Sequence, residues 1–326
     1  QSPLIRVDGP VDDVDIKIDC DYPLTAGQSR GDCLQSVGYD PDRLIHLLRV
    51  HDSTIRSAGR SGVAIHSGCI DCIIESSTFD CVSDQDIDLE GSGGISGLTI
   101  RNNAFRSSCP SQSSLSVSLF ASDHVIFCDN QMDGRGLDLY GCADCEVARN
   151  AILQRSRTDD PVVFWRKTGG GSIHNNQITR MPTAGPGGLI AIATKITAPS
   201  NVTVRDNVLD QRTAAAGLYA NGIDGLTIIG NQFLLSNKLD AISIEGAPNG
   251  GLPGSRIDVA SNSMIGPWRS AVRLSGGYTG LIAPIAITNN ISESPMVCDS
   301  GPGIRGGVVY EGNMMPTPTS CVGVIE

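Results

Sequence analysis

The chain has few aromatic residues, few basic residues and no long apolar run. Phe, Trp and Tyr make up 4% of its 326 residues, so Ile, Val and Leu must supply most of the interior. Lys and Arg number 24 against 35 Asp and Glu, a formal net charge of −11 that argues against nucleic acids and anionic membrane surfaces as partners. No window approaches the roughly 20 uninterrupted apolar residues of a membrane span. We therefore expect neither a nucleic-acid nor a membrane partner.

Helical spacing of apolar residues is also missing, and alternation takes its place. An alternating apolar segment that runs into Asn and then into another apolar residue recurs, as in GLTIRNNAF from Gly97 and NVTVRDNVL from Asn201. Period-2 alternation predicts strands, and a repeat of 20–31 residues is typical of a solenoid. Aligning the phrases gives one column: Ser77, Asn103, Asn130, Asn150, Asn176, Asn207, Asn231, Asn262 and Asn290.

This column indicates a turn, because Asn tolerates the left-handed backbone region and its side-chain amide can bond to the Asn one coil away. A second strand precedes each phrase and a third follows the Asn. The sequence predicts an all-β parallel β-helix of about ten coils with an Asn ladder. We expect a single domain over 1–326, with an irregular N-terminal cap at 1–43, coils at 44–313 and a C-terminal cap at 314–326.

Eleven cysteines favour an oxidising, extracellular location, and the odd count leaves one unpaired in a monomer. The expected pairs are Cys20 with Cys33, Cys81 with Cys109, and Cys298 with Cys321. The CxxC runs at Cys69 and Cys142 lie three coils apart, roughly 14 Å, too far for one zinc site. Cys72 and Cys145 fall in the inward column and are expected in the core.

The second strand carries the candidate site, because its alternation separates inward from outward side chains. With Ile87 and Leu89 inward, Asp88 and Glu90 point outward. Extending the pattern one coil upstream over LIHLLRV makes His46 outward as well. An ordinary solvated strand face carries Ser, Thr, Lys and Glu, whereas this one concentrates His, Asp, Glu, Tyr and Arg. Its members are His66, Asp86, Asp88, Glu90, Phe120, Asp138, Tyr140, Phe164, Arg166, Tyr219, Glu245 and Arg273.

The alternating strand, Asn turn and following apolar residue, repeated from Cys72 to Ile291, resemble the right-handed parallel β-helix of the pectate-lyase-like superfamily. The resemblance covers about two thirds of the chain. It implies a polysaccharide ligand on the outward face, and the activities of the superfamily include lyases, hydrolases, epimerases, phage tail-spike depolymerases and non-enzymatic adhesins. No specific family motif matches. The run from Asp40 to Arg43 resembles the Asp-Pro-His-Asp of alginate epimerases, but Asp42 stands in place of their His.

Three uses of the acidic strand remain open. In a hydrolase, one carboxyl protonates the glycosidic oxygen and another activates water; Asp88 and Asp138 lie two coils apart, roughly 9.6 Å, and Asp88 with Glu90 is a closer pair. In a lyase, Asp86, Asp88 and Glu90 would bind Ca²⁺, and Arg166, Tyr140 or His66 would move the proton. In a non-enzymatic adhesin, phage spike or surface spike, these charges only keep the sheet soluble.

We expect an extracellular or cell-surface protein that binds a polysaccharide or oligosaccharide and hydrolyses it, without a cofactor unless Ca²⁺ assists. A homo-oligomer is compatible with the sequence, and the sugar is not encoded in any motif. The expected catalytic residues are His66, Asp88, Glu90, Asp138 and Arg166. The expected substrate-binding residues are His46, Asp86, Phe120, Tyr140, Phe164, Tyr219, Glu245 and Arg273.

Overall fold

The computed structural model describes most of the chain, and its described part contains strands, turns and no α-helix. The described residues are 3–21, 31–37, 43–66, 68–108, 115–155, 158–166, 169–185, 187–193, 200–235, 239–247, 253–276, 280–299, 303–321 and 324–325. Within them, no helix has the length and apolar character needed to cross a membrane. The chain forms two compact units, Gln1–Ser156 and Arg157–Glu326.

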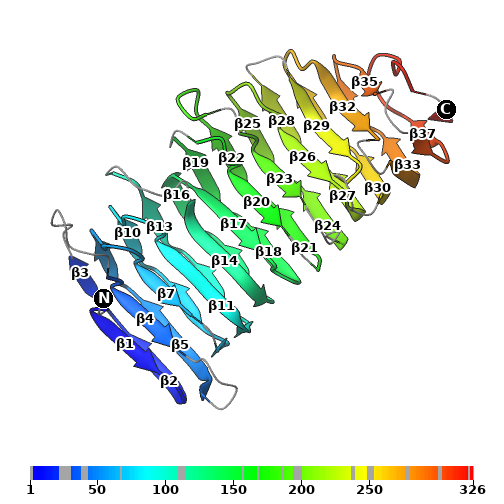
Figure 1. The fold of residues 1–326 in the computed structure, drawn as a ribbon. Coiled ribbons are helices and arrows are strands. Elements are labelled where there is room, and N and C mark those ends of the chain that lie inside the picture. The colour runs from blue at the N-terminus through cyan, green and yellow to red at the C-terminus, as the bar shows by residue number, and fades with distance from the viewer. Residues whose placement is uncertain are drawn as a thin grey trace. The chain divides into compact units, whose positions relative to one another are not determined.

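The first unit is a parallel β-solenoid with three faces (Figure 1). Each strand pairs in parallel with the equivalent strand one coil away, as Ile87–Leu89 does with Val63–Ile65. We name the faces A, B and C by their strands. Face A holds β1 (Ile5–Asp8), β4 (Leu34–Val37), β7 (Val63–Ile65), β11 (Ile87–Ser96), β14 (Leu115–Asp123) and β17 (Gly136–Tyr140). Face B holds β2 (Val11–Ile16), β5 (Ile45–His51), β8 (Cys69–Ile70), β9 (Ile73–Glu75), β12 (Thr99–Arg101), β15 (Ile126–Cys128) and β18 (Cys145–Ala148). Face C holds β3 (Asp19–Asp21), β6 (Thr54–Arg56), β10 (Thr78–Asp80), β13 (Ala104–Arg106), β16 (Gln131–Gly134) and β19 (Ala151–Gln154).

The second unit repeats this plan with its own strands. Its face A holds β20 (Val163–Arg166), β23 (Ile190–Ala193), β26 (Leu218–Asn221), β29 (Asp240–Glu245), β32 (Ser270–Ser275) and β35 (Met296–Cys298). Its face B holds β21 (Gly171–His174), β24 (Ser200–Arg205), β27 (Asp224–Ile229), β30 (Gly254–Ala260), β33 (Leu281–Thr288), β36 (Ile304–Arg305), β37 (Val308–Glu311) and β38 (Val324–Ile325). Its face C holds β22 (Gln177–Arg180), β25 (Val208–Gln211), β28 (Gln232–Leu235), β31 (Ser263–Ile265) and β34 (Ile291–Ser292).

The core consists of stacked columns of like residues. Ile87 pairs with Val63 and Val117 in register, and all three side chains are buried. Phe79 and Phe105 stack with ring centroids 5.1 Å apart on neighbouring coils of face C. The alternation predicted for face A is therefore confirmed, since every second residue of β11 from Ile87 to Leu89 faces the interior.

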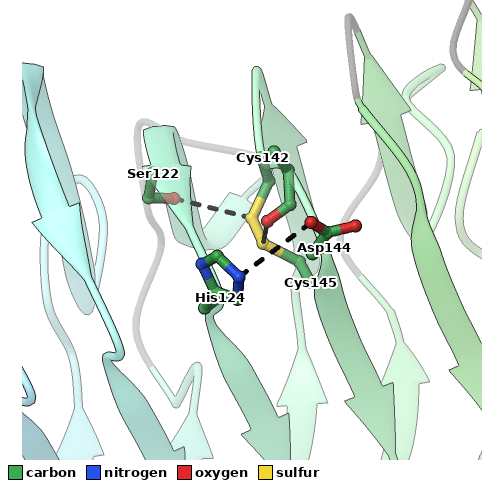
Figure 2. The surroundings of a disulfide bond; sticks show 6 residues. Ser122, His124, Cys142, Asp144 and Cys145 are labelled. Atoms are coloured by element: carbon green, nitrogen blue, oxygen red, sulfur yellow. Dashed lines mark hydrogen bonds and ion pairs between the residues drawn. A yellow bond between two sulfur atoms is a disulfide. The ribbon is translucent and has the colours of Figure 1, made fainter.

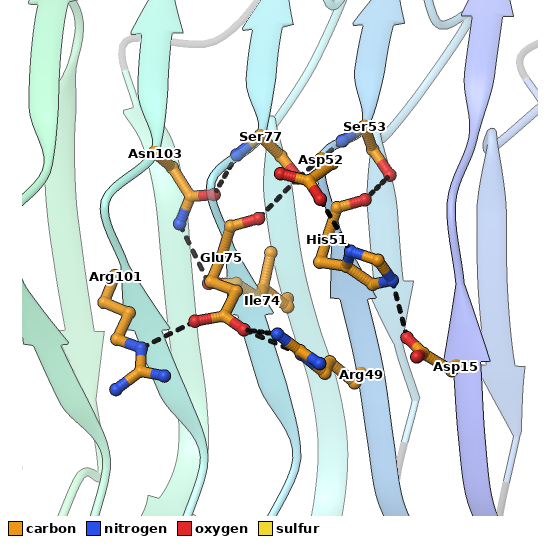
Figure 3. Close-up of polar contacts among 10 residues, drawn as sticks. All are labelled: Asp15, Arg49, His51, Asp52, Ser53, Ile74, Glu75, Ser77, Arg101 and Asn103. Atoms are coloured by element: carbon orange, nitrogen blue, oxygen red, sulfur yellow. Dashed lines mark hydrogen bonds and ion pairs between the residues drawn. The ribbon is translucent and has the colours of Figure 1, made fainter.

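The turn from face B to face C carries a row of hydrogen-bonded side chains. Asn103 Oδ1 accepts from the Ser77 backbone amide at 3.0 Å, and Asn103 Nδ2 donates to the Ile74 carbonyl at 2.9 Å (Figure 3). Asn103 Nδ2 also donates to Asn130 Oδ1 on the next coil, at 3.1 Å. Figure 3 shows Ser53 and Ser77 continuing this row toward the N-terminus. In the second unit, the same bonds link Asn176, Asn207, Asn231, Asn262, Asn290 and Asn313.

The left-handed backbone conformation lies one residue earlier than the sequence predicts. Asn102 and Asp129, not Asn103 and Asn130, have positive φ, at 55° and 57°. The division is physical: the residue at positive φ makes the bend, and the next side chain satisfies the backbone amides that the bend would leave buried.

The predicted N-terminal cap is wrong, because residues 1–43 contain β1–β4, which pair in parallel with the following coils. This shifts the register upstream of β7. The strand next to β7 on face A is β4, and LIHLLRV forms β5 on face B instead. His46 therefore pairs with Asp12 and Ile70 on face B, and its expected place on face A is wrong.

Each unit contains disulfide bonds within it. The predicted bonds Cys20–Cys33 and Cys298–Cys321 are present, while Cys109 of the third predicted pair lies outside the described residues. Both CxxC runs also form disulfides, which the sequence interpretation missed although it placed Cys72 and Cys145 in the core correctly. Figure 2 shows Cys142–Cys145 beside Ser122, whose hydroxyl donates to Cys142 Sγ at 3.5 Å. Cys128 is a buried free thiol.

Candidate functional site on face A of the first unit

The centre of the candidate site is a pair of carboxyl groups on one strand. Asp88 and Glu90 stand two residues apart on β11, so alternation directs both side chains outward, and they are hydrogen-bonded to each other. The Asp88 residue is only 8% exposed. Burial, the hydrogen bond with Glu90 and the charge of Glu90 raise the pKa of Asp88 to about 8. Burial and Glu90 therefore favour the protonated form of Asp88.

Arg60 fixes Glu90 from the side and is itself fixed by a buried acid. Its Nε and Nη2 donate to the two carboxylate oxygens of Asp32, at 2.8 and 2.7 Å. Its Nη1 donates to Glu90 Oε1. Asp32 is buried and also accepts from the Ser61 backbone amide at 3.1 Å. The guanidinium thus has a carboxylate on both sides, and these contacts raise its pKa.

His66 connects Glu90 to Gln35. Nδ1 of His66 lies 2.9 Å from Glu90 Oε2, and Nε2 lies 2.6 Å from the Gln35 amide nitrogen. With the amide in this orientation its nitrogen can only donate, so Nε2 accepts a hydrogen bond from Gln35. Nδ1 then carries the ring hydrogen and donates a hydrogen bond to Glu90. Glu90 consequently has hydrogen-bond donors from Asp88, Arg60 and His66.

Asp86 does not belong to this surface, and its predicted outward position is wrong. The residue precedes β11 and is fully buried. Its Oδ2 lies 2.7 Å from Arg135 Nη2 and accepts from the Ser116 hydroxyl. Burial raises the pKa of Asp86 to about 6, and Arg135 and Ser116 oppose the rise. The described residues bring no three His, Cys, Asp or Glu together as a metal site, so Asp86, Asp88 and Glu90 do not fit the predicted Ca²⁺ ligand set.

Two aromatic rings continue the outward column from Glu90. The register pairs Glu90 with Phe120 and Phe120 with Tyr140. The two rings stack with centroids 4.8 Å apart and planes 5° apart, and Phe120 is 40% exposed. In the neighbouring column Ser118 separates Asp88 from Asp138, which places the two acids two strand spacings apart. Asp138 itself is buried.

Sequence reasoning named Asp88, Glu90, His66, Phe120, Tyr140 and Asp138, and the structure places them on adjoining strands of one unit, with His66 directly after β7. Sequence reasoning missed Asp32, Gln35 and Arg60. The alternation of Leu34, Gln35 and Ser36 could have found Gln35, had 1–43 not been interpreted as irregular. Asp32 and Arg60 precede their strands, where no periodic signal exists.

The remaining predicted residues lie on face A of the second unit. Arg166 stacks over the Phe164 ring at 4.5 Å. The Tyr219 hydroxyl donates to Glu245 Oε2 at 3.0 Å and accepts from the Asn221 amide at 3.0 Å; burial raises the pKa of Tyr219. Arg273 pairs with Asp299. Their assigned functions stay predictions.

A comparison with protein-family models agrees with this architecture. Residues 43–233, more than half of the chain, match the family model of the right handed beta helix region. The chain belongs to the right-handed β-helix family. No curated protein matches the sequence of this family member. Among solved structures it is similar to the A-module of the mannuronan C-5 epimerase AlgE6 of Azotobacter vinelandii. That match has 12% identity and a TM-score of 0.46, and covers 96% of this chain and 77% of that one. Asp40, Pro41 and Asp42, noted above for an epimerase-like run, lie outside the described residues.

Proposed function

We propose that the chain binds a polysaccharide along face A of the Gln1–Ser156 unit and hydrolyses a glycosidic bond there, with Asp88 as the general acid. The observation that carries the proposal is the Asp88–Glu90 pair on β11, in which Asp88 is almost fully buried; burial and Glu90 raise the pKa of Asp88 and so favour its protonated form. A glycosidic oxygen is a poor leaving group until it is protonated, so a carboxylic acid that is neutral at pH 7 is the group the reaction requires.

Glu90 prepares this acid without acting on the bond itself. Its hydrogen bonds with Arg60 and His66 stabilise its charge, and that charge disfavours ionisation of Asp88. Because Asp88 and Glu90 share a hydrogen bond, they stand closer than the roughly 5–9.5 Å that separates an acid and its partner across a glycosidic bond. The partner carboxylate must come from another strand.

Asp138 is the candidate for that partner. Two strand spacings separate it from Asp88, roughly 9.6 Å between backbones, close to the range of inverting hydrolases. In the proposed step, Asp88 gives its proton to the glycosidic oxygen, water attacks the anomeric carbon, and Asp138 takes the proton of that water. The bond to the leaving sugar breaks; Asp88 then regains a proton from solvent, and Asp138 releases to solvent the proton that it took from the water.

The stacked Phe120 and Tyr140 rings would bind a sugar ring beside the acid, since aromatic faces pack against the apolar C–H faces of sugars and Phe120 is exposed. Disulfides within the described residues accord with an extracellular location, which we propose as well. His46 is left out of this site because it lies on face B.

The test compares Asp88→Asn and Asp138→Asn with Ser118→Ala, which changes the residue between them on β14. On a panel of glycans, reducing-end release by the wild type without ultraviolet absorbance from unsaturated sugars identifies hydrolysis. We expect each Asn variant to lose at least about 100-fold in turnover, and Ser118→Ala to lose little. The wild-type rate should fall as the pH rises above about 8, because Asp88 then loses its proton.

Unchanged turnover in both Asn variants would exclude the carboxylate mechanism. Release of unsaturated products would indicate a lyase instead. Glycan binding without turnover would indicate an adhesin, and neither binding nor turnover would remove the proposal altogether.

A further inference from the structure

We infer that the glycan bound at this site is uncharged, without uronic acid carboxylates. The inference rests on the proposed function and concerns the same site. It follows from how the described residues of the first unit distribute charge around Asp88, and it predicts which polysaccharides are rejected as well as which are bound.

Carboxyl groups dominate the surroundings of Asp88. Glu90 is its hydrogen-bond partner, and Asp84 is close enough for its charge to disfavour ionisation of Asp88. Asp138 lies two strands away in the same column, and Asp32 lies behind Arg60. A sugar that reaches the proton of Asp88 must therefore approach a surface with an excess of acidic groups.

The nearby basic groups are already committed to these acids. All three donor nitrogens of Arg60 contact carboxylates, two on Asp32 and one on Glu90. Arg135 is buried, where it pairs with Asp86 and donates to the Asp84 carbonyl. On β1, which β4 and β7 separate from β11, Arg6 pairs with Asp8. A uronate carboxylate would have to displace one of these acids to obtain a partner.

A uronate in such a place is repelled rather than held. Two like charges a few ångströms apart at a partly buried surface disfavour binding by about tenfold or more, and the repulsion is weaker at higher ionic strength. An uncharged sugar avoids this repulsion, can accept the proton of Asp88, and can pack against the exposed part of Phe120, which is paired with Glu90.

The experiment uses Asp88→Asn, which removes the acid but keeps the neutral state of residue 88, so that binding is measured without turnover. Calorimetry or affinity electrophoresis compares the free-acid and methyl-esterified forms of the same polyuronate, and neutral glucans, xylans and mannans, at low salt with a chelator present. We expect neutral and esterified chains to bind at least about tenfold more tightly than free-acid chains, and this ratio to shrink with added salt. The double variant Asp84→Asn with Asp88→Asn removes one of the repelling carboxylates, so its affinities for uncharged and free-acid chains should differ less.

Each outcome distinguishes the two proposals. Free-acid chains that bind as tightly as the esterified or neutral chains, or more tightly, would overturn the inference and leave the hydrolase proposal in place. A preference for uncharged chains that salt does not reduce would also overturn it, because repulsion would not be the cause. If no glycan binds and the wild type turns none over, the proposed function fails, and the inference fails with it.

Discussion

Asp88 is expected to destabilise the fold at neutral and alkaline pH. Its pKa is 3.8 in an exposed setting and about 8 in the folded chain, where burial and Glu90 favour the protonated form. Between these values only the folded chain holds the proton. The contribution of protonated Asp88 to the unfolding free energy is therefore fully present below pH 4 and is lost as the pH rises toward 8. Asp88→Asn is neutral throughout, so its advantage in unfolding free energy should grow over this window to on the order of 2 kcal/mol. Denaturant titrations of both proteins at several pH values measure it.

Asp129→Asn is the matched control, because the pKa of Asp129 is shifted in the opposite direction to that of Asp88. The hydrogen bond from Arg149 lowers the pKa of Asp129, so that carboxyl favours the folded state in its charged form. Its Asn variant should not gain stability at any pH. A pH-independent difference between wild type and Asp88→Asn would show that Asp88 titrates as an ordinary carboxyl, and the acid role proposed for it would lose its basis.

Strand alternation predicts single residues well only where the strand itself is regular. Asp88 and Glu90 follow Ile87 on β11 and were placed correctly, because parity alone decides their face. Asp86 precedes that strand, and the groups that bury it, Ser116 and Arg135, come from other coils. Such contacts between coils depend on loop paths, which carry no period in the sequence.

At the scale of the repeating element, the Asn rows should carry a measurable share of stability. Asn130 Oδ1 accepts from the Asn103 backbone amide at 3.0 Å, while Asn130 Nδ2 donates to the Ile100 carbonyl at 2.9 Å and to Asn150 Oδ1 at 3.1 Å. Asn130→Ala leaves these buried groups without partners, so we expect a loss of about 2–4 kcal/mol in unfolding free energy. Chemical denaturation followed by far-ultraviolet circular dichroism measures it.

Gln131→Ala is the control. The Gln131 side chain, on β16, follows Asn130 and is exposed, so its removal should change the unfolding free energy by less than about 0.5 kcal/mol. Similar effects of the two substitutions would mean that the amide row contributes nothing beyond its backbone turn. The sequence predicted the row from one recurring residue type. It misplaced the bend by one position, since Asn is common both at positive φ and as a hydrogen-bonding turn residue.

At the scale of the whole molecule, each coil contacts mainly its neighbours, so stability is divided along the chain. The sequence predicted this division from its repeat, but missed the first coil, formed by β1–β3, and the strand β4 that begins the next coil. Those strands lack the Asn phrase, and Ser53 takes the place of Asn in the next turn of the row. A repeat search depends on side-chain identity, whereas the pairing of β1 with β4 depends on the backbone.

The disulfides allow this division of stability to be tested, because they differ in the length of chain that they close. Cys298–Cys321 spans 23 residues and Cys142–Cys145 spans 3. Loop-closure entropy predicts a loss of roughly 3 kcal/mol when the first pair is replaced by Ser, and roughly 2 kcal/mol for the second. Since coils depend on their neighbours, the C-terminal variant should raise hydrogen exchange in β35 and β37 while β26 and β29 keep their protection. Exchange that rises equally across the second unit would show instead that its coils unfold as one cooperative body.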